Sequence, residues 1–429
     1  MRRFVLVVVL AASACGAQDR GAVPPLDVGV SNVAVMKARR AQDDYVVVLE
    51  TLTRLADVER PDRVLRRFRA AGGAALDYAA PAGATIADFA AHPEGEVTVL
   101  LVNDAGYALE RWLPDGARGG AVEVAGVVPT RWSRDAGRVA AAGDDDVLAV
   151  RADDNSVRGL RYTPDGAGYR MVWDVVIEPA NDLLAGGLTS GSYDTFGQMR
   201  EPFRAYVDVG ADAAVWVGVA VDPASGLLDA HNAAFGDDLG FVAGPQPSSD
   251  LLVTRLDSAG RRLFSRVVGT PWRDQVYGMR AVGPGLLVVG RSSTRPGVAG
   301  GWDGLVIRVA EDGTAAARTV DVNAGDILFD ADLLSDGRTV AVGGTGYIDN
   351  PTGASVSEAC SLLAVVLTDA AQTSLALPSL PRHDHLRTLV VDGTTAWVAG
   401  MSNGPGTHSG DSDPSAIRAD PFVATLAVP

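Results

Sequence analysis

The sequence predicts an all-β fold made of repeated units, each with four short strands. From residue 25 onward, short runs rich in β-branched residues alternate with Gly, Asp-Gly and Pro, and no segment has the periodicity of an amphipathic helix. Turns that end in glycine recur at intervals of 50, 94 and 53 residues, at Gly116, Gly166, Gly260 and Gly313. A second marker, an apolar run that ends in glycine, recurs at intervals of 54 and 56 residues, at Gly290, Gly344 and Gly400.

A repeat of about 45–55 residues with four strands is typical of the blades of a β-propeller. One blade cannot bury both of its faces, so it must stack on neighbours, and a closed ring protects most strand edges. We therefore predict a propeller of four-stranded antiparallel blades, with seven blades. Eight blades is the alternative, because the 94-residue interval has room for two. We prefer one blade with insertions there, since Phe203–Val209 and Val215–Val221 pair naturally around Gly210.

The last three units define the expected strands. The clearest unit has strands at Arg262–Val268, Val276–Val282, Leu286–Gly290 and Gly304–Val309. The two units that follow have strands at Ala316–Val322, Ile327–Leu334, Arg338–Gly343 and Ser361–Leu367, and at Gln372–Leu377, Leu386–Val391, Thr395–Gly400 and Pro421–Val428. Earlier blades are expected at 73–117, 118–166 and 167–259, after an N-terminal unit at 25–72. In that unit, Arg63, Arg66, Arg67 and Arg69 are expected on a solvated outer strand.

A motif in two successive units links this pattern to known proteins. It reads Asp-x-x-Val-x-Arg-x-x-x-x-Gly and is carried by Asp250, Val253, Arg255 and Gly260, and again by Asp303, Val306, Arg308 and Gly313. An apolar strand follows, and then a strand that ends in Val-x-Gly. The combination resembles bacterial β-propeller repeat proteins of the seven-bladed kind, over residues 250–429. The resemblance implies the fold and says little about chemistry.

The N-terminus has the three-part form of an export signal. Two arginines precede the apolar run Phe4–Leu10, and small residues follow up to Cys15. The run is shorter than the about 20 residues that span a bilayer. Segment 10–16 resembles a bacterial lipoprotein signal, although Ala12 stands where those proteins most often have Leu. The resemblance implies that Cys15 is lipidated and becomes the first mature residue.

The alternative is an ordinary secretory signal that is cleaved at the small residues 12–14, with Cys15 incidental. We expect a signal peptide at 1–14, a short linker at 15–24, and one propeller domain at 25–429 with loop insertions at about 179–202 and 222–249. The protein is then exported and anchored through lipid on Cys15 in the cell envelope, at the outer membrane on its periplasmic or surface side. The second cysteine, Cys360, begins an apolar run and is expected in the core.

The long connections are all expected on one rim of the propeller. Segments 179–202, 222–249, 291–302, 344–359 and 401–419 are extended, whereas the connections at the other end of the strands are tight. Long loops on a rigid scaffold are the usual place for binding. The candidate ligand-binding residues on this rim are Tyr193, Asp194, His231, Asn232, Trp272, Trp302, His383 and His385. Their mixture of aromatic and polar groups suits a polar ligand or a sugar ring.

Composition and the absence of known motifs exclude several classes of function. The net charge of −16 argues against a nucleic-acid partner, because neutralising phosphates needs a basic surface. The sequence has no P-loop, zinc-protease, paired-cysteine or nucleophile-elbow motif, so we expect no cofactor and no metal and assign no catalytic residue. A binding module that acts as a monomer on an envelope protein or glycan is our first hypothesis. A carbohydrate-active propeller enzyme with an axial site, hydrolase or lyase, is the alternative.

Overall fold

A computed structural model of the whole chain gives the architecture. It describes residues 33–51, 62–68, 74–127, 137–180, 205–221, 226–244, 249–294, 301–346, 361–377, 385–403 and 419–428, apart from 153, 155, 167 and 376. Cys15, Cys360, Tyr193, Asp194 and His383 lie outside the described residues.

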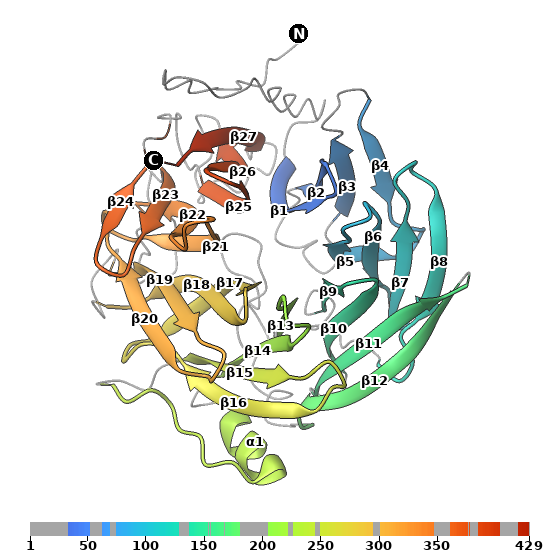
Figure 1. Cartoon of the computed structure of the whole chain (residues 1–429), viewed down its shortest axis with the longest axis horizontal. Helices are drawn as coiled ribbons and strands as arrows, with labels where there is room; N and C mark the ends of the chain where they lie inside the picture. Colours follow the sequence, from blue (N-terminus) through green and yellow to red (C-terminus); the bar gives the residue numbers. More distant parts are fainter. Residues whose placement is uncertain are drawn as a thin grey trace, which may run out of the picture.

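The chain forms a seven-bladed β-propeller, as the sequence predicts, with the blades arranged in chain order around an axis (Figure 1). Each blade is one antiparallel sheet. The first four blades are β1 (Val33–Ala41), β2 (Asp44–Thr51), β3 (Asp62–Phe68) and β4 (Leu76–Ala79); β5 (Thr85–Ala91), β6 (Val97–Val102), β7 (Tyr107–Trp112) and β8 (Arg118–Glu123); β9 (Arg138–Ala142), β10 (Asp145–Arg151), β11 (Val157–Asp165) and β12 (Gly168–Glu178); and β13 (Ala205–Val209), β14 (Val215–Val221), β15 (Asp250–Leu256) and β16 (Arg262–Val268).

The last three blades are β17 (Asp274–Val282), β18 (Gly285–Ser292), β19 (Asp303–Val309) and β20 (Ala315–Val320); β21 (Ile327–Leu333), β22 (Thr339–Thr345), β23 (Ser361–Leu367) and β24 (Gln372–Ser374); and β25 (His385–Asp392), β26 (Thr395–Asn403) and β27 (Ala419–Ala427). The first strand of every blade is innermost, where it contacts the first strands of the neighbouring blades. The long interval holds one blade, in which β13 pairs with β14 around Gly210 as expected. This settles the number of blades at seven.

The grouping of strands into blades differs from the sequence expectation by one strand. The expected unit that begins at Arg262–Val268 in fact begins with β17, because β16 pairs with β15 and closes the preceding blade. The reason is the turn between the third and fourth strands. At Gly313 this turn is a hydrogen-bonded hairpin, in which Gly313 N–H donates to Ala310 O and Ala310 N–H to Thr314 O. Such a turn joins neighbouring strands about 4.8 Å apart and cannot cross from the outer edge of one sheet to the inner edge of the next.

Glycine at the end of these hairpins is needed for its backbone conformation. Gly313 has φ +85° and Gly260 has φ +80°, in the left-handed region that side chains disfavour. Gly116 and Gly337 close turns of the same form, with φ +92° and +85°. The glycine-turn marker in the sequence therefore reports hairpins within sheets and does not mark their boundaries.

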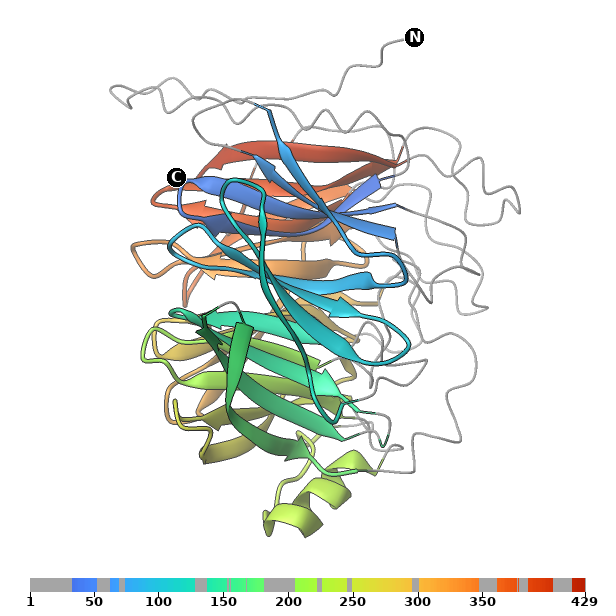
Figure 2. The same cartoon turned by 90° about the vertical axis from the view of Figure 1, so that its right-hand side faces the viewer.

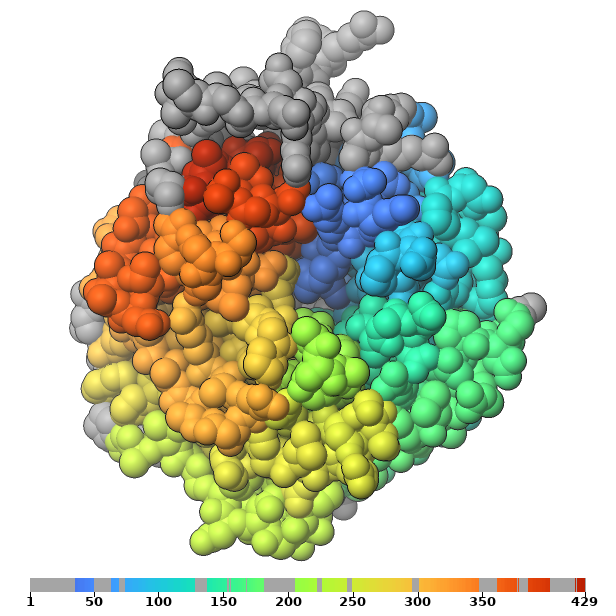
Figure 3. All heavy atoms as spheres, in the orientation of Figure 1, coloured from blue at the N-terminus to red at the C-terminus, as the bar shows by residue number. Residues whose placement is uncertain are grey.

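The two faces of the propeller carry connections of different length. Turns that join the first strand to the second and the third to the fourth have at most seven residues, which gives a tight-turn face, shown in Figure 3. Connections that join the second strand to the third, or one blade to the next, leave from the other face and reach 28 residues between β14 and β15. We call this the loop-bearing face, and it lies on the right in Figure 2. The expectation that all long connections share one rim is therefore confirmed by the strand order.

The core lies between the blades. One cluster joins Trp216, Leu251 and Val253 of the fourth blade to Val288 and Ile307 of the fifth, and similar clusters fill the other blade interfaces. The helix α1 (Leu227–Phe235) packs outside the fourth blade through Leu227 and Leu228 (Figure 1). Among the residues that the structure describes, no helix is long and apolar enough to cross a membrane.

The prediction that the arginine-rich strand of the first blade is its solvated outer strand is wrong. Arg67 lies on β3, the third strand of its sheet, and is fully buried with its guanidinium 4.9 Å from the Trp112 ring centroid. It also donates a 2.7 Å hydrogen bond to Gly95 O. Arg63 is buried as well and donates to Ile86 O of the second blade. Guanidinium groups stack on aromatic rings and reach backbone carbonyls, so these arginines join the first blade to the second.

Candidate functional site

Five of the seven innermost strands carry a β-bulge at the same place. The register shifts within the first five residues of β1, β5, β17, β21 and β25, at the end of each strand that meets the loop-bearing face. A bulge redirects the side chain of the extra residue. Here the extra residues all line one axial pocket: Met36, Ala87, Tyr277, Phe329 and Arg387.

The glycine that ends the apolar run in the sequence lies opposite three of these bulges. Gly290, Gly343 and Gly400 pair with the residues directly before the bulges of β17, β21 and β25. A Cβ at Gly290 would lie 1.9 Å from Gln275 O, and a Cβ at Gly400 would lie 2.0 Å from His385 O. The equivalent residue in the sixth blade is Gly343, one before the Gly344 that the sequence spacing suggests. This marker therefore records close backbone approach at the wall of the pocket.

The axial pocket has a volume of about 140 Å³ and lies at the loop-bearing end of the axis. All seven innermost strands contribute to its wall, together with Val48 of β2 and Arg63 of β3. Among the described residues of the wall, the charged side chains are five cations and two carboxylates: Lys37, Arg39, Arg63, Arg138, Arg387, Asp88 and Asp330. Cations therefore outnumber carboxylates in the described part of the wall, although the whole chain carries −16.

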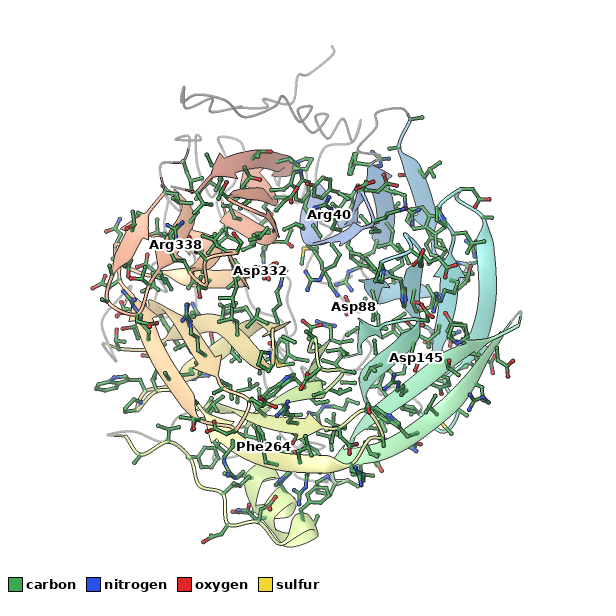
Figure 4. The ribbon with its side chains drawn as sticks, viewed as in Figure 1. Arg40, Asp88, Asp145, Phe264, Asp332 and Arg338 are labelled. Carbon is green, nitrogen blue, oxygen red and sulfur yellow. The ribbon has the colours of Figure 1, made fainter. Side chains whose placement is uncertain are left out.

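Asp88 joins three blades at once. Its Oδ1 accepts a 2.6 Å hydrogen bond from Lys37 Nζ of the first blade, and its Oδ2 accepts one of 3.0 Å from the Val139 N–H of the third. Figure 4 shows Asp88 and Asp332 on opposite sides of the axis. Innermost strands expose a row of backbone donors along the axis, and a buried donor needs a partner. Asp88 supplies that partner and fixes the spacing of the blades.

Asp330 does the same on the other side of the ring. Its Oδ2 accepts hydrogen bonds from Thr388 Oγ1 at 3.0 Å and from the Leu389 N–H at 3.1 Å, both in the seventh blade. Arg280 of the fifth blade donates to both carboxylate oxygens of Asp330. Thr388 Oγ1 in turn accepts from the Ala38 N–H at 3.0 Å. This chain of bonds runs through the fifth, sixth and seventh blades and closes the ring onto the first.

Burial changes the acid–base properties of Lys37 and Arg39, the two cations of β1 that line the pocket. Desolvation lowers the pKa of Lys37 to about 8, against the opposing effect of Asp88, and the neighbouring cations Arg39 and Arg138 lower it further. Desolvation and then the charge of Arg280 also lower the pKa of Arg39, although Asp330 lies 3.8 Å away. Burial raises the pKa of Asp208, despite the nearby Arg39. The positive groups around the axis thus sit in a crowded, poorly solvated environment.

Aromatic rings form the other part of the wall. The Tyr277 and Phe329 ring centroids are 5.2 Å apart at an interplanar angle of 65°, and the Arg387 guanidinium lies 4.2 Å from the Phe329 centroid. Tyr206 is anchored by a 2.6 Å hydrogen bond from its hydroxyl to Val276 O. The pocket therefore combines cations with flat apolar surfaces.

The candidate residues chosen from the sequence are spread over the molecule. His231 lies on α1 and is fully buried, with Nδ1 2.9 Å from Glu178 Oε1 and Nε2 3.1 Å from Asp237 Oδ2. The Asn232 side chain donates a hydrogen bond to Leu239 O at 2.8 Å and accepts one from the Leu239 N–H at 3.0 Å. Trp302 is half-buried with its ring centroid 4.2 Å from the Arg291 guanidinium.

The remaining described candidates lie at strand ends. Trp272 is half-buried between β16 and β17. His385 is buried at the start of β25, where its ring centroid lies 5.5 Å from that of Phe329. The structure therefore does not gather His231, Asn232, Trp272 and Trp302 with His385 at one site. A ligand role for these residues, and for Tyr193, Asp194 and His383, stays a prediction.

Sequence reasoning missed the pocket residues because they are spread over all seven blades. The sequence did contain one signal. Lys37 is the single lysine of the chain, beside 36 arginines, and this marks it as a candidate functional residue. A second signal was the Val-x-Gly marker, whose glycines face the bulges. Among the described residues, no three His, Cys, Asp or Glu side chains are grouped so as to hold a metal ion.

Comparison with known proteins finds similarity in fold alone. No protein-family model and no curated protein matches the chain. The β-propeller domain of the Trilobed protease from Pyrococcus furiosus aligns over 92% of this chain and 94% of its own, with a TM-score of 0.48 and 9% identity. A chain of the mitotic checkpoint complex aligns over 93% and 95%, with a TM-score of 0.47 and 9% identity.

An acylaminoacyl peptidase from Pyrococcus horikoshii aligns over 94% of this chain, with a TM-score of 0.48 and 8% identity, but over only 52% of its own length. This chain therefore spans about half of that peptidase. Propellers serve many unrelated functions, and at such identities the likeness concerns the fold. The strand order of the chain itself makes it a seven-bladed β-propeller.

Proposed function

We propose that the protein is an exported, lipid-anchored binding module of the bacterial cell envelope, and that it holds a small ligand in the axial pocket on its loop-bearing face. The observation that carries the binding function is the convergence of five bulged residues on one pocket. Bulges cost ladder hydrogen bonds, and a set of them aimed at one place is typical of a built site. Export and anchoring rest on the N-terminal sequence, with Cys15 as the lipidated residue.

The state of the carboxylates favours binding over hydrolysis. Both oxygens of Asp88 are engaged, one by Lys37 and one by the Val139 N–H. Both oxygens of Asp330 are engaged as well, by Arg280 and by donors of the seventh blade. A general acid or base must have an oxygen that can reach the substrate proton. These two carboxylates instead hold neighbouring blades together.

The binding function can be tested with a matched pair of phenylalanine variants. Phe329 lines the pocket. Phe264 lies on the outer strand β16 (Figure 4), where its ring packs against Trp216. Native mass spectrometry of the protein purified from envelope fractions should detect a bound small molecule in the wild type and in Phe264→Leu. We expect Phe329→Leu to lose it. Retention in both variants, or the absence of any bound molecule in the wild type together with no thermal stabilisation by envelope extracts, would overturn the proposal.

The anchoring can be tested separately. In cells, wild-type protein should fractionate with the membrane, and its N-terminal peptide should carry a diacylglyceryl adduct on Cys15. Cys15→Ser should lose the adduct and enter the soluble envelope fraction. Cleavage before residue 15 with no adduct would instead support the ordinary secretory signal.

The carbohydrate-active enzyme is kept as a second candidate because two carboxylates, Asp88 and Asp330, do line the pocket. Product analysis after incubation with envelope polysaccharides distinguishes the two functions. Cleavage that is lost in both Asp88→Asn and Asp330→Asn, in variants shown to be folded, would favour the enzyme.

A further inference from the structure

One amine lies among the guanidinium groups of the axial pocket. Lys37 is the single lysine of the chain, and its side chain, 22% exposed, lines the pocket. The other cations in the described part of the wall are arginines, whose guanidinium groups stay protonated and are not nucleophiles. A lysine amine can lose its proton and then attack an electron-poor carbon. Among these cations, Lys37 is therefore the one that can form a covalent bond with a ligand.

The fold holds the Lys37 nitrogen in a defined position at the pocket wall. Lys37 directly follows the bulge at Met36 on β1. Its Nζ donates hydrogen bonds to Asp88 Oδ1 at 2.6 Å and to Phe89 O at 2.9 Å. The same nitrogen lies 5.1 Å from the Phe89 ring centroid. Because both partners lie on β5 of the second blade, the amine is already oriented before a ligand arrives, which lowers the entropic cost of a reaction with it.

The surroundings of Lys37 favour the neutral, reactive form of its amine. Desolvation lowers the pKa of Lys37 to about 8, against the opposing effect of Asp88. Arg39 and Arg138 add to this lowering of the pKa. Desolvation and neighbouring cations are the two conditions that activate a lysine for imine formation. At pH 7.5 about a quarter of the amine is then neutral, compared with about 0.1% for an ordinary lysine.

We propose that the axial pocket takes a small aldehyde with a flat apolar group, and that Lys37 holds it covalently as an imine. This inference rests on the proposed binding function and names both the ligand class and the residue that bonds to it. The Lys37 nitrogen attacks the aldehyde carbon, and a C–N bond forms as the C=O bond opens. The oxygen leaves as water with two of the protons from the nitrogen. Ammonium and aldehyde thus give a protonated imine and water, and no oxidant or reductant is needed.

The wall has room and contacts for such a ligand. A volume of about 140 Å³ can hold one aromatic ring with its aldehyde group. Tyr277 and Phe329 line the pocket with ring centroids 5.2 Å apart, and aromatic rings pack well on such surfaces. The protonated imine keeps the positive charge of Lys37. The ion pair with Asp88 is therefore preserved, and so is the hydrogen bond from the Val139 N–H to that carboxylate.

Benzaldehyde with cyanoborohydride tests the proposal, because the reductant converts an imine into a stable secondary amine. Peptide mapping by mass spectrometry should find a benzyl adduct on residue 37, which separates it from an adduct on the N-terminal amine. The rate should saturate with benzaldehyde concentration. Benzyl alcohol, which has no carbonyl group, should form no adduct and should slow the reaction by competing for the pocket.

Matched variants separate the effect of the pocket from ordinary amine chemistry. Arg261→Lys adds a reference amine on a side chain that is 82% exposed. In that variant, residue 37 should react at least tenfold faster than residue 261 at pH 7.5. Phe329→Leu should slow the reaction at residue 37 at least fivefold, whereas Phe264→Leu on the outer strand β16 should leave it unchanged. Circular dichroism establishes that each variant is folded.

Each outcome decides the proposal. Equal rates at residues 37 and 261, a rate at residue 37 that does not saturate, or the same rate in Phe329→Leu and Phe264→Leu would overturn it. A molecule without a carbonyl group that the wild type binds and Phe329→Leu loses, together with an unreactive Lys37, would exclude the imine and leave the binding function intact. If the pocket holds no molecule of any kind and Lys37 does not react, both the imine and the binding function are wrong.

Discussion

Gly343 on the second strand of the sixth blade lies against the carbonyl of Ile327 on the first. A Cβ at position 343 would be 1.8 Å from Ile327 O, closer than any real contact. Ile327 begins the strand whose bulge follows at Leu328 and Asp330. The glycine therefore permits the bulge, and the bulge directs Phe329 into the pocket.

Gly343→Ala should lower the free energy of unfolding by about 3 kcal/mol, because the backbone must move to accept a methyl group. Urea unfolding followed by circular dichroism measures it. Gly240→Ala is the control, since its Cβ would meet nothing within 4 Å, and it should change stability by less than about 0.5 kcal/mol. Equal effects of the two substitutions would show that the contact with Ile327 is relieved without cost.

Asp330→Asn should also destabilise the ring. The side chain is only 12% exposed and serves Arg280, Thr388 and Leu389. Loss of its charge leaves Arg280 with Asp332 as its remaining ion-pair partner and weakens the hold on the seventh blade. Breaking a buried pair in this way costs about 3 kcal/mol. Asp369→Asn removes an aspartate that also pairs with an arginine, Arg308, but is 96% exposed, and its unfolding curve should match the wild type. A wild-type curve for Asp330→Asn as well would exclude a role in holding blades together.

Lys37 should make stability depend on pH between about 8 and 10.5. Desolvation lowers its pKa in the folded protein to about 8, whereas an unfolded lysine keeps its proton up to about 10.5. In this window the unfolded state binds more protons, so the free energy of unfolding of the wild type rises with pH relative to Lys37→Met. The gain should be at most about 3.4 kcal/mol. A constant difference between the two proteins from pH 7 to 10.5 would contradict the lowered pKa.

His231 should have the opposite pH dependence. Burial alone would lower its pKa, but hydrogen bonds and charges from Glu178 and Asp237 outweigh this, and the pKa lies above its usual value. The resulting stabilisation is present below about pH 6.5 and is lost as pH rises through the folded pKa. His231→Gln should therefore cost more stability at pH 6 than at pH 9, and hydrogen exchange should increase in α1. Glu178→Gln should flatten this pH dependence, and equal costs of His231→Gln at both pH values would contradict it.

The propeller fold and the loop-bearing face could be derived from the sequence because both depend on local chemistry. Hairpin glycines such as Gly313 and apolar runs such as Leu287–Gly290 recur at blade spacing, and turn length alone separates the two faces. The grouping of strands could not be read from periodicity, since a repeat has the same period wherever it is taken to begin. The hairpin geometry at Gly313 was the missing observation.

The residues of the pocket could not be derived from the sequence. In the sequence, 51 residues separate Lys37 from Asp88 and 242 separate Asp88 from Asp330. The pattern of each strand gives no sign that these side chains meet. They meet because the ring brings the same strand position of every blade to one axis. By itself the sequence determined the repeat, the fold, the rim with the long connections and the form of the N-terminus. Only the tertiary structure decided which side chains face one another, because closure of a ring depends on contacts between blades and local sequence specifies contacts within them.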